Sequence, residues 1–226
     1  MRSIWRTLDS GVLRDILTLA LAAGVVGASF GAISMAAALP WWVPSLMSVL
    51  VFAGGSQFLA VGVIAAGGGP VAAVVGGLVL NARHLPFGLA VGDVFGTRWA
   101  HRLVGSHLLT DETVAFAMAQ RDPARRRAVY WVTGAALFIC WNLGVLGGVA
   151  VGRAVGDPAA FGLDAAFPAA LFALVLPSLR DAATRRAALF GAAIALLATP
   201  FVPAGIPVLL ALLGMVAARA PQVVRA

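Results

Sequence analysis

The sequence predicts an all-α integral membrane protein with about six to eight membrane-embedded helices, some of them broken or re-entrant. Hydrophobic residues make up 61% of the 226 residues, and the mean hydropathy is +0.96. Only 11% of the residues are charged, against about 25% in an ordinary soluble domain. Between Asp15 and Arg83 no residue carries a formal charge, which leaves room for two or three spans of about 20 residues each. We therefore expect one polytopic membrane domain over residues 1–226, with no soluble catalytic or nucleic-acid-binding domain.

The net charge of +7 would suggest nucleic acid as a partner in a soluble protein. Here, however, the basic residues are all arginines, and they lie between and beside the apolar segments, a pattern typical of membrane orientation. The arginines of residues 1–15 predict a cytoplasmic N-terminal segment followed by a retained first span. The single Cys140 excludes a disulfide within the chain.

The first half of the chain contains three apolar segments, over residues 16–39, 41–66 and 71–91. Glycines and alanines in the first segment favour close helix contacts. The second begins with two tryptophans suited to a membrane interface, and Gly54-Gly55 in its middle weakens the helix. Broken backbone persists at membrane depth only where protein or a water-filled cavity satisfies it. A Gly-Gly-Gly-Pro connection then leads into the third segment, which carries the polar residues Asn81, Arg83 and His84.

The second half begins with a polar connection over residues 93–127, which contains a short helix-like run at 103–119. Spans over 128–151 and 165–179 follow, and the arginines before and after them indicate cytoplasmic ends. Prolines divide the last apolar stretch, 187–218, into a short helical hairpin. We expect both termini in the cytoplasm.

Counting the crossings leaves two arrangements. Three full spans in the first half would place the arginines of the polar connection outside, against the orientation rule. In the first arrangement the segment with Gly54-Gly55 is re-entrant and does not cross. In the second, residues 103–119 cross the membrane despite their charges. The sequence slightly favours the second, because 41–66 is long enough to span and a transport site would need a buried charged helix.

Three polar clusters lie in this apolar sequence, and each is a candidate site because charges and free backbone groups are costly there. The first cluster is Gly54, Gly55, Ser56 and Gln57. Its exposed backbone could hold a substrate carboxylate or a coupling ion. Alternatively, the cluster is a glycine-mediated helix crossing, and its side chains bond to neighbours.

In the second cluster Asn81 and His84 share one helical face, with Arg83 about 100° away. Arg83 could bind a substrate carboxylate, pair with Asp111 or Glu112, or extend towards head groups. His84 could relay protons, or it could be satisfied by a backbone carbonyl.

The third cluster is Asp111 and Glu112, after Thr110. Glu112 has Leu108 and Phe116 one turn away, an apolar environment that suits a carboxyl group exchanging protons. The alternative is an ordinary helix start, with Thr110 as the N-cap and two acidic residues in the first turn.

The absence of their sequence motifs excludes dinucleotide-binding proteins, P-loop proteins and zinc metalloproteases. No G-x-G-x-x-G opens a strand–helix unit, no P-loop exists because the chain has no lysine, and no histidines have H-E-x-x-H spacing. We therefore expect no enzyme, no catalytic residue, no metal site and no cofactor.

Four motifs together resemble the AzlC family, the large subunits of branched-chain amino-acid exporters. They are Phe52-Ala53-Gly54-Gly55-Ser56-Gln57-Phe58, Asn81-Ala82-Arg83-His84, Leu109-Thr110-Asp111-Glu112 and Phe167-Pro168-Ala169-Ala170-Leu171-Phe172. The resemblance extends from about Gly24 to the C-terminus, and the order and spacing of the four motifs are similar to those in the family. The resemblance implies a multi-pass protein of the bacterial inner membrane. It also implies a partner, a small AzlD-like membrane subunit of about four helices.

The leading hypothesis is a permease that exports Val, Leu, Ile or a similar apolar amino acid, driven by the proton gradient. Because an apolar pocket distinguishes one methylene by only about 1–3 kcal/mol, we expect a broad substrate range. The alternatives are a non-transporting assembly subunit and a passive channel. We expect Gln57, Arg83 and Glu112 to converge on one cavity. The predicted substrate-binding residues are Gly54, Gly55, Ser56, Gln57, Asn81 and Arg83, and the predicted proton-coupling residues are His84, Asp111 and Glu112.

Overall fold

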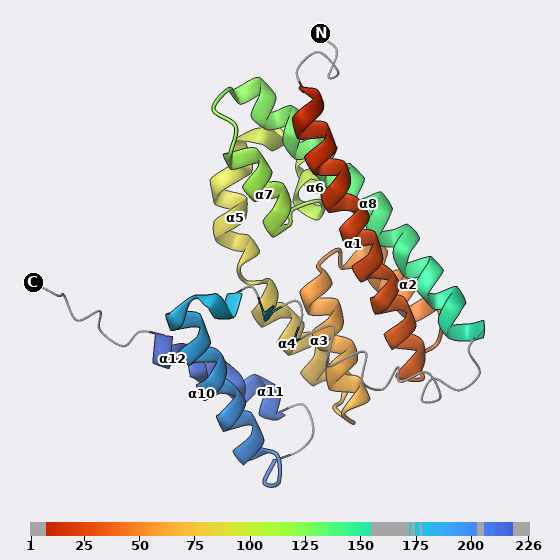
Figure 1. Ribbon diagram of the computed structural model, residues 1–226, viewed down its shortest axis with the longest axis vertical. Helices are drawn as coiled ribbons and strands as arrows, with labels where there is room; N and C mark the ends of the chain where they lie inside the picture. Colours follow the sequence, from red (N-terminus) through yellow and green to blue (C-terminus); the bar gives the residue numbers. More distant parts are fainter. Residues whose placement is uncertain (1–7, 155–171, 173–174, 177, 203–205, 219–226) are drawn as a thin grey trace, which may run out of the picture. The chain divides into compact units, whose positions relative to one another are not determined.

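The computed structural model describes residues 8–154, 172, 175–176, 178–202 and 206–218, and all regular elements there are helices (Figure 1). In the described part of the chain, three helical segments are long and apolar enough to cross a membrane: Ser10–Ala36, Pro70–Phe95 and Pro123–Ala154. This confirms the all-α membrane class. The larger number of six to eight embedded helices and the cytoplasmic termini stay predictions. The chain divides into two compact units, residues 1–57 with 80–164, and residues 58–79 with 165–226.

Two long helices, α1 (Ser10–Ala36) and α8 (Pro123–Ala154), pack side by side in the first unit (Figure 1). Asp9 caps the start of α1 by accepting the backbone N–H of Val12 at 3.0 Å, so the helix begins six residues before the predicted apolar segment. A Cβ on Gly24 would meet the carbonyl oxygen of Cys140, and one on Gly148 would meet that of Ala28. Glycine is therefore what allows the two backbones to approach so closely.

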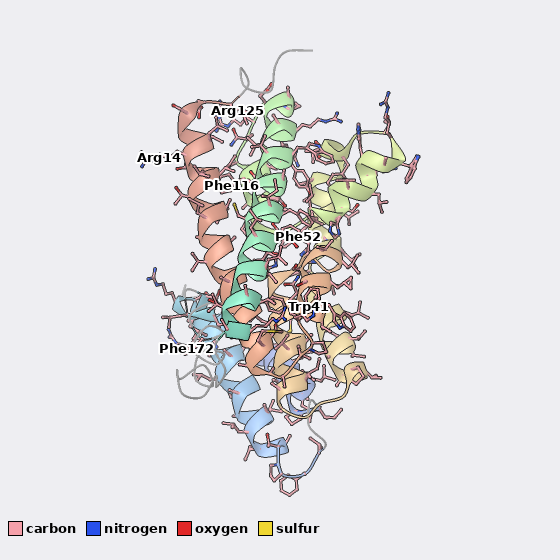
Figure 2. The ribbon with its side chains drawn as sticks, turned by 90° about the vertical axis from the view of Figure 1, so that its right-hand side faces the viewer. Arg14, Trp41, Phe52, Phe116, Arg125 and Phe172 are labelled. Atoms are coloured by element: carbon pink, nitrogen blue, oxygen red, sulfur yellow. The ribbon has the colours of Figure 1, made fainter. Side chains whose placement is uncertain are left out.

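The same contacts show that α1 and α8 run in parallel. Contacts advance together along both helices, from Gly24 beside Gly144 to Met35 beside Gly152. Both helices therefore begin at the same end of the unit, where Figure 2 shows Arg14 and Arg125, while Trp41 lies towards the opposite end. Arg14 and the basic residues at the start of α8 thus lie at the same end of the first unit.

The predicted break in the second apolar segment is present. Helix α2 (Trp42–Leu50) ends before it, and α3 (Gly54–Ala65) begins at Gly54. Along α2 the contacts with α8 move backwards, from Trp41 beside Arg153 to Ser48 bonded to Asn142. The Gln57 side chain then bonds back to α2, so the chain has turned round at residues 51–53. The chain therefore folds back at residues 51–53, and the re-entrant arrangement of this segment in the membrane stays a prediction.

The following apolar segment forms α4 (Pro70–Asn81) and α5 (His84–Val91), continued by the short 3-10 helix η2 (Gly92–Phe95). Ala82 and Arg83 form a turn between α4 and α5. The end of α5 reaches the starting end of α8, because Arg126 donates to the carbonyl of Ala90 and pairs with Asp93 at 3.5 Å. Helix α5 therefore runs antiparallel to α8.

Residues 103–119 do not form one crossing helix, so the arrangement that the sequence slightly favoured is wrong. They divide between α6 (Trp99–His107) and α7 (Asp111–Met118). Thr110 starts α7 with a capping box, in which it and Thr113 satisfy each other's backbone N–H groups. Both helices return to Tyr130, which donates to the carbonyl of Gly105 at 2.8 Å and packs among α7 residues. The reason is local: the strong N-cap at Thr110 begins a new helix where one continuous helix was considered.

The second unit contains the end of α3 and most of α4, where Leu59 packs on Gly76. It also contains η4 (Ser178–Arg180), α10 (Ala182–Ala198), α11 (Ile206–Leu210), η5 (Ala211–Gly214) and α12 (Met215–Ala218). A Cβ on Gly191 would meet the carbonyl of Ala211, which places α10 against η5. Helix α10 and the elements that follow it thus pack together, while the hairpin predicted for 187–218 stays a prediction, because residues 203–205 lie outside the described part of the chain. The predicted span 165–179 and the motif 167–172 lie almost entirely outside the described residues.

Candidate functional site

The first polar cluster lies where α2 ends and α3 begins. Gln57 is fully buried, and its amide nitrogen donates to the carbonyls of Met47 at 3.0 Å and Val51 at 3.2 Å. Its amide oxygen accepts the indole N–H of Trp141 at 3.2 Å. Because both amide donors and an oxygen lone pair are used, Gln57 holds the turn together. Of the two predicted alternatives for this residue, the contacts of Gln57 favour a side chain that bonds to neighbouring helices over one that binds a ligand.

Ser56 and Gly55 face the turn between α4 and α5. The Ser56 hydroxyl donates to the side-chain oxygen of Asn81. A Cβ on Gly55 would lie 3.6 Å from the guanidinium of Arg83. The structure thus joins the first predicted cluster to the second, through contacts between residues 25 or more positions apart.

Arg83 extends from this turn to the third cluster. Its Nε lies 3.4 Å from a carboxylate oxygen of Asp111, and both side chains are half-exposed at 40% and 46%. Of the three roles considered for Arg83, pairing with an acidic residue is the one that the contacts favour. An ion pair at membrane depth needs protein or water around it, because lipid cannot solvate either charge.

His84 lies at the start of α5, beside the same group of charges. Its Nδ1 lies 3.1 Å from the carbonyl oxygen of Asn81, so the predicted backbone bond is present. The carboxylates of Asp111 and Glu112 and the guanidinium of Arg83 all interact electrostatically with its ring. In the chain His84 follows Arg83 and Glu112 follows Asp111, so both are direct neighbours of the ion-paired residues, whereas the amide of Gln57 bonds to α2 and Trp141.

Aromatic side chains that the sequence analysis did not select surround the turn at residues 51–53. Trp141 bonds to Gln57, and a Cβ on Gly54 would lie 2.8 Å from the Trp141 ring. Only glycine fits at position 54 without displacing this ring. The adjacent Trp141 and Asn142 in an apolar span were the signal that could have found this contact, since their polar groups need partners there.

The arrangement could hold a small zwitterion. The first turn of α3 presents the positive end of the helix dipole, and Arg83 lies beside it, so together they suit a carboxylate. Asp111 and Glu112 at the start of α7 suit an ammonium group or a proton. Among the described residues, no group of three or more His, Cys, Asp and Glu side chains could hold a metal ion.

A model of the family described as "AzlC protein" matches residues 18–155 of the chain. A protein of Helicobacter pylori, described as "Uncharacterized membrane protein", is 32% identical over 92 residues. This match covers 40% of the chain and 40% of the relative. No solved structure matches.

Proposed function

This chain belongs to the AzlC family, and from that premise we propose that it exports branched-chain and similar apolar amino acids, coupled to the proton gradient. The family is associated with branched-chain amino-acid transport and is a transporter-type membrane family. The observation that carries the proposal is the run of contacts from Ser56 through Asn81 and Arg83 to Asp111.

The substrate carboxylate would bind between the first turn of α3 and the guanidinium of Arg83. Gly54 and Gly55 leave the backbone of this turn open to a close ligand, which a larger side chain would obstruct. The substrate ammonium group would bind Asp111, which requires its pair with Arg83 to open. Because both side chains are already half-exposed, this exchange of partners needs little rearrangement.

Glu112 and His84 would carry the coupling proton. The two side chains interact electrostatically beside the ion pair, so a proton on either one changes the charge that the substrate meets. An inward proton movement could in this way be linked to outward release of the amino acid.

We also propose that a small AzlD-like subunit completes the site in the inner membrane. The pair of Arg83 and Asp111 is too exposed to face hydrocarbon, and a second membrane subunit would remove it from lipid. The chain alone would then be one part of the transporter.

Efflux of labelled Leu and Val tests the proposal in cells that express the chain with its partner. Arg83→Gln should lower export at least about tenfold, because a charged hydrogen bond to the carboxylate is lost. Arg121→Gln, a matched change outside the site, should leave export unchanged. Glu112→Gln should remove the dependence of export on external pH. If Arg83→Gln lowers the amount of protein but leaves the flux per molecule unchanged, the chain is an assembly subunit and the proposal is wrong.

A further inference from the structure

The two folded-back segments, α2 with the start of α3 and α6 with α7, have a similar construction. Helices α2 and α6 are both nine residues long and begin at Trp42 and Trp99. Each is followed by a short link, residues 51–53 or 108–110, and then by a helix that begins at Gly54 or Asp111. The bounds of α2 and α6, the two links and the starts of α3 and α7 are each 57 residues apart, whereas α3 is four residues longer than α7. Each segment then leads into an apolar stretch whose first helix starts with a proline, α4 at Pro70 and α8 at Pro123.

The two segments enter from opposite ends of α8. Helix α2 starts beside Arg153, at the far end of α8, and reaches Asn142 at Ser48. Helix α6 starts at the other end, with His101 beside Trp131 and Gly105 bonded to Tyr130. Their first tryptophans are both exposed, at 53% and 77%, as residues at two opposite membrane interfaces would be.

The two tips meet at the middle of α8. Phe52 lies in the first link, residues 51–53, and His107 directly precedes the second link, residues 108–110. The centroids of their rings are 6.2 Å apart. Both rings pack against Phe138, at 5.1 Å and 5.7 Å. Phe138 is at the midpoint of the 32-residue helix, so this contact lies at mid-depth. Phe52 is only 8% exposed, and Figure 2 shows it between the ends of α8.

We propose that the two hairpins are an inverted repeat and act as two opposing gates, with the rings of Phe52, His107 and Phe138 as the closed contact between them. Inverted repeats with broken helices that meet at the midplane are a construction that lets access alternate between two sides. The polar groups of each hairpin, at Gly54–Ser56 and at Thr110–Glu112, come directly after the aromatic contact. Movement of one hairpin would open these groups to one side while the other hairpin keeps the path closed.

The aromatic contact suits a gate because its energy is small and its geometry tolerant. Ring pairs with centroids 5–6 Å apart add only a small stabilisation beyond burial, so they can part and re-form. The α1–α8 contact, in which glycine backbones touch, offers no such movement. The hairpins rather than α1 are thus the elements able to move against α8.

Cross-linking in membrane vesicles tests the contact, using the full chain with Cys140→Ser so that no other thiol is present. In the F52C/H107C variant, a short bifunctional thiol reagent should join the two positions. Tryptic cleavage at Arg83, Arg98 and Arg102 separates them unless they are linked, so mass spectrometry detects the product. The matched control is W42C/W99C, the corresponding pair at the two outer ends, which should give no product. No cross-link in F52C/H107C, or equal yields in both variants, would overturn the proposal.

A leak measurement tests the gate separately. Vesicles with F52A/H107A should conduct protons, followed with a pH-sensitive dye, several-fold faster than wild type, and F52L/H107L should remain tight because leucine refills the contact. Equal proton tightness of F52A/H107A and wild type, at equal protein level, would contradict the gate.

The inference rests on the proposed function only in its choice of solute. Added Leu should lower the F52C/H107C yield at least twofold. If the cross-link and the leak are observed but Leu changes neither, the gate is retained and the proposed substrate is wrong. If the cells export Leu but neither the cross-link nor the leak is observed, the proposed substrate is retained and the gate is wrong.

Discussion

The two sides of α8 are packed in different ways. Towards α1 the contact is made by glycines, and a Cβ on Gly144 or Gly148 would strike the backbone of α1. Towards the hairpins it is made by aromatic rings and single hydrogen bonds, such as those of Ser48 to Asn142 and Trp141 to Gln57. Backbone contact has one geometry and tolerates no added atoms, whereas side-chain contacts can exchange partners. We infer that α1 and α8 form the fixed frame and the hairpins its adjustable part.

The largest effect should come from the fixed side. Gly148→Leu places a side chain against the carbonyl of Ala28, and forcing the helices apart should lower the free energy of unfolding by roughly 3 kcal/mol. Gly147→Leu is the control, because nothing lies within 4 Å of a Cβ there. Thermal denaturation in detergent measures both. Equal loss in the two variants would show that the α1–α8 contact is not the rigid one.

An intermediate effect should come from the first hairpin. Gln57→Leu leaves the indole N–H of Trp141 and the carbonyl of Val51 without their partner, at a cost of about 2 kcal/mol. Trp141→Phe in the same chain removes the unpaired donor, so the double variant should lose less than the two single variants together. A double-mutant cycle of unfolding free energies measures the coupling between Gln57 and Trp141. Strict additivity would show that their hydrogen bond does not stabilise the turn at residues 51–53.

The smallest effect should come from the exposed end of the frame. The backbone N–H of Val12 and the Arg125 guanidinium both hold the pKa of Asp9 below its ordinary value of 3.8. Because the pKa is lower in the folded state, the contribution of Asp9 is present above about pH 4 and is lost as the pH falls through the lowered pKa. The protection of the first turn of α1 against hydrogen exchange, taken relative to the intrinsic exchange rate at each pH, should therefore fall in acid, and Asp9→Asn should remove that dependence. A pH response that persists in Asp9→Asn would come from another group.

Local signals in the sequence predicted the parts of the fold that depend on few residues. The uncharged stretch predicted the membrane class, and Gly54-Gly55 predicted the break between α2 and α3. The return of α6 and α7 was missed because it depends on contacts with Tyr130 far along the chain. The cap at Thr110 was considered, but only as an alternative to a site, without its consequence for the path of the chain.

The candidate site was predicted in its members more fully than in its geometry. Sequence spacing selected Ser56, Asn81, Arg83 and Asp111, and the fold brings them into one run of contacts. Sequence spacing could not separate Gln57 from this group, because the partners of Gln57 come from α2 and from Trp141, 84 residues later. An amide in an apolar sequence has the same pattern whether it binds a ligand or a neighbouring carbonyl.

The pairing of α1 with α8 also sets an order for biosynthesis. Gly24 rests on Gly144, and the ribosome makes these two residues 120 positions apart. At about 5–20 residues per second, α1 waits roughly 6–24 s in the bilayer before its neighbour is made. During that interval its glycine face has only lipid or an insertion factor beside it. Helix α1 is therefore fixed in place long after it is made, and translation pauses between α1 and α8 should be when assembly is most vulnerable.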